Sequence, residues 1–406
     1  MMPENSDDRC ATMAGDHASS PSSQGVEPVP YSTLNPPEGI TPAQTREPYS
    51  WSFPQYKDAP PDLPGRLPRQ SWTPQERKTY EARVKWFHEA KYGIFFHYLS
   101  GGAWTPEEWN RWVDAVDVEK VADQAKAVGA GYVILTLGQN HIYSCAPNPI
   151  IDELWKSELG PFTSRRDLPM DLWKALDRRG IPLMLYLASD NQHKMPQPPA
   201  MTYADRFEGW KKVAQWYSSH YGARCKGWWL DGLGEFIPDY RVNIRQALKD
   251  GNPDTIVACD YEVSDFTHGH CMENWARQSK VVKPFYGRWD PDFNIQWHVF
   301  QFIGPTWGAP GCNKKPEDLV RYAVDVVRGG GVFTFDLGTF TEGCFHQLPA
   351  DIPTGRKPDG SRIGPFLEIQ PDQFAILEAV RDAVKDIPPS DGRRGGRCNM
   401  EKQACR

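Results

Sequence analysis

Short apolar runs that stop at polar residues recur along the middle of the chain. Residues 92–97 (Tyr-Gly-Ile-Phe-Phe-His), 131–136, 181–186 and 226–231 are runs of this kind. The stretches before the later runs carry apolar residues at helical spacing, most clearly over 118–128, 172–179 and 203–221. Strands alternating with helices at such intervals predict a parallel sheet, which is either a barrel or a doubly wound fold.

The second half of the chain continues the alternation less regularly. Residues 255–260, 296–302 and 332–336 are typical of strands five, seven and eight, and helical patterns cover 316–328 and 371–384. Strand six must fall near 266–275, too close to strand five for a normal helix between them. We therefore predict a (β/α)8 barrel over about residues 77–385 that is irregular around strands five and six.

The two ends of the chain differ in composition from the middle. Residues 1–70 are rich in Pro, Ser, Gly and acids and lack apolar periodicity, which predicts a disordered or surface-wrapping extension. A first helix should follow over 74–90, capped by Ser71 or Thr73. The tail over 388–406 is rich in Gly and Arg and should be flexible. The acidic start has no basic and apolar secretory pattern, so we expect a cytoplasmic protein.

The composition of the chain argues against several classes of binding partner. A net charge of −6 argues against nucleic acid or a membrane surface, and no apolar run reaches the length of a membrane span. Nine scattered cysteines without Cys-x-x-Cys pairs predict free thiols, and neither a metal-ligand spacing nor a phosphate-binding glycine motif is present. We thus expect no cofactor and no metal, and a small molecule or glycoside as ligand. The 16 Trp, 16 Tyr and 18 Phe suit both a filled barrel and walls that stack on sugar rings.

The segment 226–234 (Lys-Gly-Trp-Trp-Leu-Asp-Gly-Leu-Gly) holds the most informative carboxylate. An apolar and aromatic run that ends at Asp231 and then at glycine predicts a buried strand presenting an acid at its carboxyl end. In a parallel barrel all carboxyl ends lie on one face, and that face carries the chemistry. The alternative is an aspartate that merely caps the following turn.

Several segments together resemble the alpha-L-fucosidase family of glycoside hydrolases. They are residues 86–97 (Trp-Phe-His-Glu-Ala-Lys-Tyr-Gly-Ile-Phe-Phe-His), 130–136, 229–232 (Trp-Leu-Asp-Gly), 307–308 (Trp-Gly) and 329–336 (Gly-Gly-Gly-Val-Phe-Thr-Phe-Asp). The resemblance extends over about residues 80–385 and implies a barrel fold. It also implies that Asp231 is the nucleophile of a retaining glycosidase.

Two departures from the family pattern bear on function. Gln139 and Asn140 stand where the family has two histidines that grip sugar hydroxyls, although amides can also bond hydroxyls. Where some relatives carry the acid/base glutamate, this chain has His270, and Glu273 follows three residues later. A retaining glycosidase needs a second carboxyl group about 5 Å from the nucleophile. Glu273 and His270 are therefore the two candidates for proton transfer to partner Asp231.

The predicted function is hydrolysis or transfer of an α-linked deoxy or L-sugar glycoside by a retaining mechanism. The alternatives are a lyase, cyclase or dehydratase of small-molecule metabolism on the same barrel, and a non-catalytic sugar-binding protein. Residues expected to line the ligand site lie at strand ends and in the loops that follow, including the loop that begins near Trp104. They are His97, Trp104, Glu108, Trp109, Gln139, Asn140, His141, Tyr186, Trp307 and Asp336.

Overall fold

Parallel strands form the centre of the molecule. The computed structural model describes residues 71–99, 105–139, 143–156, 160–188, 201–231, 238–259, 265–267, 287–290, 293–305, 307–312, 314–339 and 366–390. Within them seven strands pair in the order β5-β4-β3-β2-β1-β7-β6, all parallel. Their bounds are β1 (Tyr92–Phe96), β2 (Val133–Thr136), β3 (Leu183–Ala188), β4 (Cys225–Asp231), β5 (Ile256–Cys259), β6 (His298–Phe302) and β7 (Val332–Leu337).

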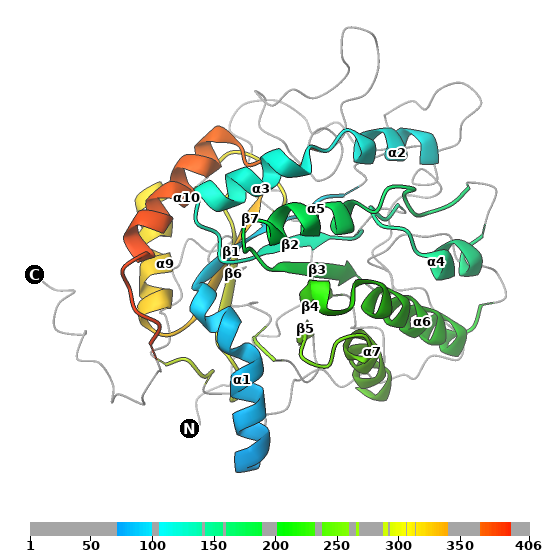
Figure 1. Cartoon of the computed structure of the whole chain (residues 1–406), viewed down its shortest axis with the longest axis horizontal. Coiled ribbons are helices and arrows are strands. Elements are labelled where there is room, and N and C mark those ends of the chain that lie inside the picture. The colour runs from blue at the N-terminus through cyan, green and yellow to red at the C-terminus, as the bar shows by residue number, and fades with distance from the viewer. Residues whose placement is uncertain are drawn as a thin grey trace, which may run out of the picture.

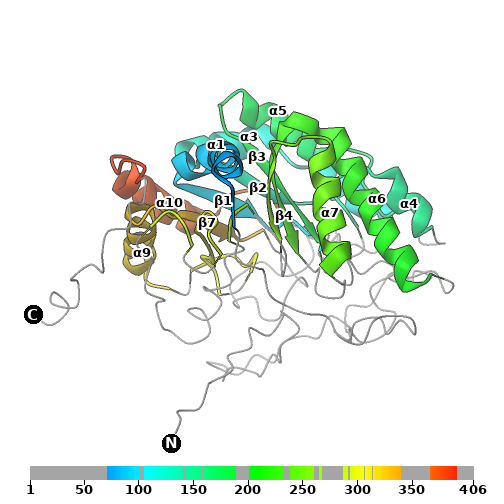
Figure 2. The same cartoon turned by 90° about the horizontal axis from the view of Figure 1, so that it is seen from below.

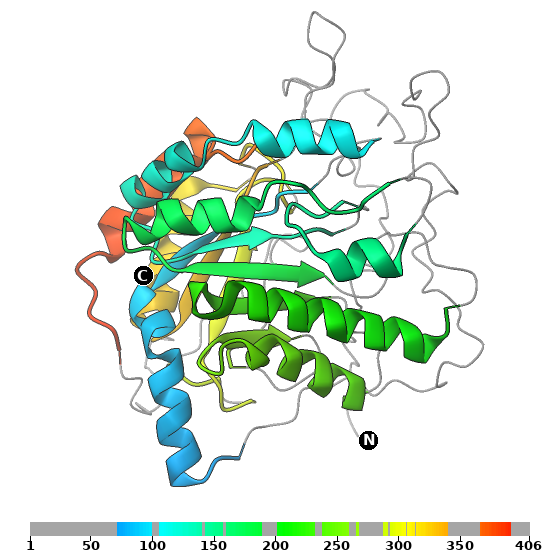
Figure 3. The ribbon, with the colours of Figure 1, turned by 45° about the vertical axis from the view of Figure 1, so that its right-hand side comes forward.

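Helices cover the outer side of these strands, and the sheet curls beneath them (Figures 1 and 2). The outer helices are α2 (Pro106–Asp114), α3 (Val118–Ala127), α4 (Pro149–Leu154), α5 (Leu168–Asp177), α6 (Tyr203–Tyr221), α7 (Pro238–Asp250), α9 (Pro316–Arg328) and α10 (Pro371–Val384), whereas α1 (Pro74–Ala90) packs against the inner side. In Figure 3, α5, α6 and α7 follow one another beside β3 and β4. Strand and helix alternate along the chain, so the predicted (β/α) barrel architecture is confirmed. None of the helices in the described ranges is long and apolar enough to cross a membrane.

The first helix closes the amino-terminal end of the barrel. Thr73, rather than Ser71, caps it, because the Thr73 hydroxyl accepts from the Glu76 amide while the Glu76 carboxylate accepts from the Thr73 amide. The helix then runs over Pro74–Ala90 as predicted. Its buried face packs into the barrel interior, where the ring of Phe87 lies 4.6 Å from that of Phe266.

The strands separate two apolar cores. Alternate residues face inward, as in Phe95 of β1, Tyr186 of β3 and Trp229 of β4, and these fill the barrel together with α1. The intervening residues face outward and pack against the surrounding helices in a larger cluster. Because both faces of every strand are covered, the strands are apolar nearly throughout, as parallel strands usually are.

The structure describes only the start of the predicted sixth strand. Between β5 and β6, the Asp265 amide donates to the Val257 carbonyl at 2.7 Å, and the Thr267 amide donates to the Gln296 carbonyl at 2.9 Å. Residues 265–267 thus link β5 to the segment before β6, and Phe266 pairs with Gln296 in a single parallel bridge. The bridge lies at the start of the range 266–275 predicted for strand six, and residues 268–275 lie outside the described ranges. Only residues 260–264 separate β5 from this bridge, too few for a regular crossover helix.

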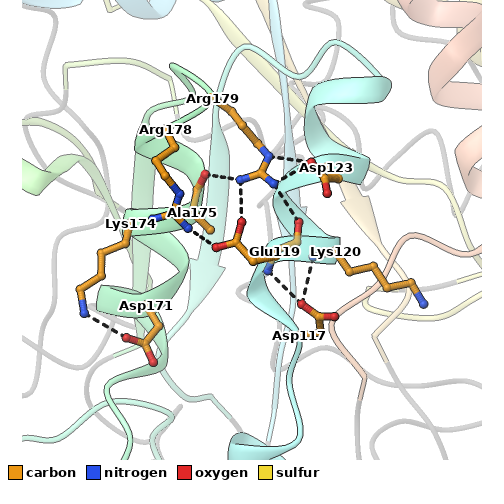
Figure 4. Close-up of polar contacts among 9 residues, drawn as sticks. All are labelled: Asp117, Glu119, Lys120, Asp123, Asp171, Lys174, Ala175, Arg178 and Arg179. Atoms are coloured by element: carbon orange, nitrogen blue, oxygen red, sulfur yellow. Dashed lines mark hydrogen bonds and ion pairs between the residues drawn. The ribbon is translucent and has the colours of Figure 1, made fainter.

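An ion-pair network joins the neighbouring helices α3 and α5 (Figure 4). Arg179, just after α5, donates to Asp123 at 2.6 Å and to Glu119 at 3.0 Å on α3. Its guanidinium also donates to the Ala175 carbonyl at 2.7 Å, and Arg178 contacts Glu119 as well. Such pairs between exposed carboxylates and arginines each stabilise a fold by up to ~1 kcal/mol. The network therefore fixes the relative position of two helices that flank β2 and β3.

Candidate active site

Five adjacent strands of the sheet each supply one polar side chain at the carboxyl end. Following the sheet order from β4 to β7, these are Asp231, Tyr186, Gln139, His97 and Asp336. Asp231 ends β4, and His97 and Gln139 come just after β1 and β2. All five side chains are buried. The sequence predicted each of these residues for the site, and the parallel register brings them into one continuous row.

Asp231 is held by two uncharged donors. The Tyr186 hydroxyl donates to Oδ2 of Asp231 in a short hydrogen bond, and the Gln139 Nε2 donates to the same oxygen at 3.2 Å. Donors that bond the ionised form of a carboxylate favour that form. The described hydrogen bonds of Asp231 thus come from β3 and from the segment after β2, and the turn that follows Asp231 lies outside the described ranges.

The row continues from Gln139 to the other end of the site. The Gln139 Oε1 is hydrogen-bonded to Nε2 of His97, whose Nδ1 lies 3.5 Å from Oδ1 of Asp336. The backbone of His97 is fixed as well, because the Thr339 hydroxyl donates to its carbonyl oxygen at 2.6 Å. These contacts connect two buried carboxylates through one amide and one imidazole.

Asp336 receives further contacts from the segment after β6. The Gly308 amide donates to its Oδ2 at 2.6 Å, from a backbone with φ of 65° that favours glycine. Burial raises the pKa of Asp336, and His97, Gly308 and the cation of Lys314 only partly offset that effect. Lys314 is half-buried over the ring of Phe302, and burial lowers its pKa to about 8 despite nearby Asp336 and Cys312. Lys314 was not predicted as a site residue, because no local sequence feature indicates that a lysine in a loop is half-buried.

An aromatic layer lies beneath the polar row. The ring of Phe95 is 5.3 Å from that of Tyr186 and 5.2 Å from that of Phe300. Trp307, predicted as a site residue, packs on this layer with its ring 4.6 Å from that of Phe300, and it is half-buried. Trp229 closes the layer at 4.3 Å from Phe300. The layer keeps water away from the underside of the carboxylates and gives the site a rigid floor.

Two of the predicted ligand-lining residues lie on a helix. Glu108 and Trp109 belong to helix α2 and not to a loop, because Thr105 caps that helix and Pro106 begins it. The indole of Trp109 is fully buried and donates to the Ser144 carbonyl at 2.8 Å, so in this conformation it packs in the outer core. Glu108 is partly buried on the same helix, with Arg111 3.8 Å away.

Five other predicted residues lie outside the described ranges: Trp104, Asn140, His141, His270 and Glu273. The same holds for the predicted extension over residues 1–70 and for the tail beyond residue 390. Within the described ranges, no group of three or more His, Cys, Asp or Glu side chains is arranged to hold a metal ion. What the described residues do provide is a buried row of hydrogen-bonding groups around two carboxylates.

Comparisons with known proteins agree on the fold. Neither a protein-family model nor a curated protein sequence matches the chain. Among solved structures, the endo-fucoidan hydrolase MfFcnA9 of glycoside hydrolase family 107 is similar, with a TM-score of 0.55 and 16% identity over 76% of this chain and 65% of that one. A second endo-fucoidan hydrolase, MfFcnA4, gives a TM-score of 0.52 at 15% identity over 75% of this chain and 54% of that one.

The alpha-L-fucosidases are similar to a comparable degree. The GH29 alpha-L-fucosidase of Bacteroides thetaiotaomicron, trapped as a covalent intermediate, gives a TM-score of 0.52 at 16% identity over 80% of this chain and 78% of that one. The chain spans little more than half of one fucoidan hydrolase and about two thirds of the other. At such identities the likeness concerns the fold. The chain thus has a (β/α) barrel fold shared with fucosidases and fucoidan hydrolases, and its polar row lies at the carboxyl ends of the strands.

Proposed function

We propose that this protein is a retaining glycoside hydrolase that works through a glycosyl–Asp231 intermediate. The observation that carries the proposal is the setting of Asp231, a buried carboxylate at the carboxyl end of β4 bonded by the Tyr186 hydroxyl and the Gln139 amide. A nucleophilic carboxylate must be ionised and held in one orientation when it attacks a sugar carbon. Two neutral donors, one from β3 and one from the segment after β2, favour the ionised form and restrict the orientation of Asp231.

The similar structures support the substrate class. The fucosidase of Bacteroides thetaiotaomicron was trapped as a covalent intermediate with 2-fluoro-fucosyl fluoride, and two other similar proteins are endo-fucoidan hydrolases. We therefore place the substrate among α-linked deoxy or L-sugar glycosides. Trp307, half-buried on the aromatic layer, is the residue we assign to stacking against the sugar ring.

The two-step mechanism needs a group that donates a proton in the first step and accepts one in the second. We assign that role to Glu273, with His270 as the competing candidate. A carboxyl group about 5 Å from Asp231 would serve as acid for the leaving group and then as base for water. An imidazole, with an ordinary pKa of about 6.5, also transfers protons near neutral pH, but the reaction then need not be glycoside hydrolysis.

A panel of nitrophenyl glycosides tests the proposal. We expect turnover of at least one α-linked deoxy or L-sugar, loss of that turnover in Asp231→Asn, and a fall of roughly 10²–10⁴-fold in Glu273→Ala on substrates with poor leaving groups. His270→Ala should be mild. Loss of activity in His270→Ala with Glu273→Ala intact would replace the two-carboxylate mechanism with an Asp–His enzyme.

The same panel also separates the other classes of function. If wild-type protein turns over none of the glycosides yet binds a free sugar in calorimetry, a non-catalytic sugar-binding protein becomes the better account. If it neither hydrolyses nor binds sugars, a lyase, cyclase or dehydratase on the same barrel is favoured. Either result would contradict the proposal.

A further inference from the structure

The amide of Gln139 lies between two groups that impose opposite demands on it. One end faces Oδ2 of Asp231 and the other faces Nε2 of His97. An ionised carboxylate only accepts hydrogen bonds, so the amide must turn its NH2 group to Asp231. Its oxygen then faces His97, and this contact is favourable only when Nε2 of His97 carries a hydrogen. The orientation of the amide and the tautomer of the imidazole are therefore coupled.

The tautomer of His97 is coupled in turn to Asp336. With the hydrogen on Nε2, the other ring nitrogen faces Oδ1 of Asp336 at 3.5 Å. If that nitrogen carried a lone pair and the carboxylate a full charge, the contact would be repulsive. The pair avoids this by keeping one proton between the two groups, either on Asp336 beside a neutral imidazole or on His97 beside an ionised carboxylate. Burial, which favours a protonated Asp336, supports the first form.

The charged and titratable groups around this pair come from several elements. Lys314, after β6, attracts a charge on Asp336, and Cys312 lies near Lys314. The Gly308 amide donates to the second oxygen of Asp336. Asp231, across Gln139, and Tyr186, whose ring centroid lies 5.7 Å from that of His97, face the other side of the imidazole.

We propose that Asp336 and His97 are positioning residues that fix the amide of Gln139 and, through it, hold Asp231 in place for attack. This inference rests on the proposed role of Asp231 as nucleophile. It gives a positioning role to His97, Gln139 and Asp336, which were expected from the sequence to bind substrate. Their described contacts include those with one another and with Asp231.

The hydrogen bond from Gln139 to Asp231 should be lost at high pH. When the shared proton is lost, the charge on Asp336 draws the remaining imidazole hydrogen to Nδ1. The lone pair on Nε2 of His97 then faces the oxygen of Gln139, and the amide rotates to donate to the imidazole. Its oxygen turns towards Asp231, where two acceptors oppose each other. Activity should therefore fall on the basic side of the pH profile as Asp336 loses its proton.

The variant Asp336→Asn tests the role of the proton on Asp336. The oxygen of the asparagine side chain accepts from Gly308 and its NH2 group donates to Nδ1 of His97, as a protonated carboxyl group does. The asparagine side chain does not titrate. We expect kcat near neutral pH within about threefold of wild type and loss of the basic decline. Asp336→Ala, which holds neither tautomer, should lower kcat by about tenfold or more with little change in KM, since a misplaced nucleophile affects the chemical step.

A control on the same strand distinguishes this effect from general loosening of the core. Thr334 of β7 is hydrogen-bonded to a further buried histidine, His298, at 2.7 Å, and also to the Tyr132 hydroxyl. Thr334→Val removes both bonds at nearly constant volume, two residues from Asp336 and on a different strand from Asp231. Its pH profile should match wild type. A basic decline that persists in Asp336→Asn, or disappears in Thr334→Val, would overturn the proposal.

A second measurement does not depend on activity. In protein labelled with ¹⁵N-histidine, the ring nitrogen shifts of His97, assigned by the loss of its signals in His97→Gln, report which nitrogen carries the hydrogen. We expect the Nε2-protonated form at neutral pH, conversion to the Nδ1-protonated form at high pH, and no conversion in Asp336→Asn. An Nδ1-protonated His97 at neutral pH in wild type would contradict the proposed row. The readout remains valid even if no glycoside is turned over, so failure of the row and failure of the glycosidase assignment are distinguishable.

Discussion

Two buried aspartates at opposite ends of the barrel show how differently a fold can treat the same side chain. At the amino-terminal end, Asp265 contacts Arg83 of α1 and Lys249 of α7, both at 2.7 Å, and accepts from the Val257 amide at 2.9 Å. At the carboxyl end, Asp231 is bonded by the neutral side chains of Tyr186 and Gln139. The first arrangement joins helices to the sheet, and the second leaves a carboxylate suited to chemistry.

The protonation of these groups follows from their surroundings. Burial raises the pKa of Asp265, but Lys249 and Arg83 outweigh burial and the net pKa is lowered. Asp336, at the carboxyl end, shows the opposite balance, since burial dominates and its pKa is raised. A cation-paired carboxylate thus stays charged and structural, whereas the row at the carboxyl end retains a proton that can respond to pH.

Asp265→Asn and Asp231→Asn should separate the two roles most strongly. Replacing Asp265 leaves the buried Lys249 and the half-buried Arg83 without their shared partner and should lower the free energy of unfolding by about 3–5 kcal/mol. Asp231→Asn retains an oxygen for both neutral donors, so we expect a change within about 1 kcal/mol together with loss of turnover. Urea unfolding at pH 7 measures the stability of both variants. A larger loss of stability in Asp231→Asn than in Asp265→Asn would contradict the comparison.

The Asp265 effect should also depend on pH with a defined sign. Because the folded-state pKa lies below the ordinary value of 3.8, the carboxylate stabilises the fold fully above that pH. The stabilisation is lost as pH falls through the folded-state pKa. The difference in unfolding free energy between wild type and Asp265→Asn should therefore shrink on acidification below about pH 4.

A smaller effect is expected from a matched pair of tyrosines. The Tyr132 hydroxyl is hydrogen-bonded to Thr334 in the amino-terminal half of the barrel, and the Tyr186 hydroxyl is bonded to Asp231. Each Phe variant loses one buried hydrogen bond, at a cost to stability of about 1 kcal/mol. Tyr186→Phe should also lower kcat/KM by roughly 10–100-fold, because a hydrogen bond to a charged group contributes about 1.5–3 kcal/mol.

Tyr132→Phe provides the control for that measurement, since its activity should stay within about twofold of wild type. Steady-state kinetics on a substrate from the glycoside panel and thermal unfolding give the two readouts. Equal loss of activity in both variants would mean that Tyr186 acts through the packing of the barrel and not on Asp231.

Local pattern was enough to predict most of the barrel. Helix α1 begins and ends where its capping signals and apolar face place it, and α6, α9 and α10 match their predicted ranges. Helix α2 was missed because its first turn is polar and its tryptophans resemble a loop wall, although Thr105 and Pro106 signal its start. Phe266, at the start of the predicted sixth strand, forms a parallel bridge with Gln296, a pairing that a short apolar run does not encode.

The site was predicted in part for a similar reason. Strand ends in a parallel barrel converge, so Asp231, Tyr186, His97 and Asp336 were identified as site residues from their positions, and Gln139 from the family resemblance. Their contacts with one another depend on strand register and side-chain orientation, and they join residues as distant in the chain as His97 and Asp336. Sequence alone therefore did not predict that Gln139 contacts both His97 and Asp231.

Covalent trapping tests the central claim, that Asp231 is a nucleophile. The protein is incubated with the 2-deoxy-2-fluoro glycosyl fluoride of a sugar it hydrolyses, and intact and peptide masses are measured. We predict one added fluoroglycosyl group per chain, located on Asp231 and absent from Asp231→Asn, because fluorine slows breakdown of the intermediate. An adduct on another residue, or hydrolysis of the glycoside by Asp231→Asn at the wild-type rate, would contradict the account.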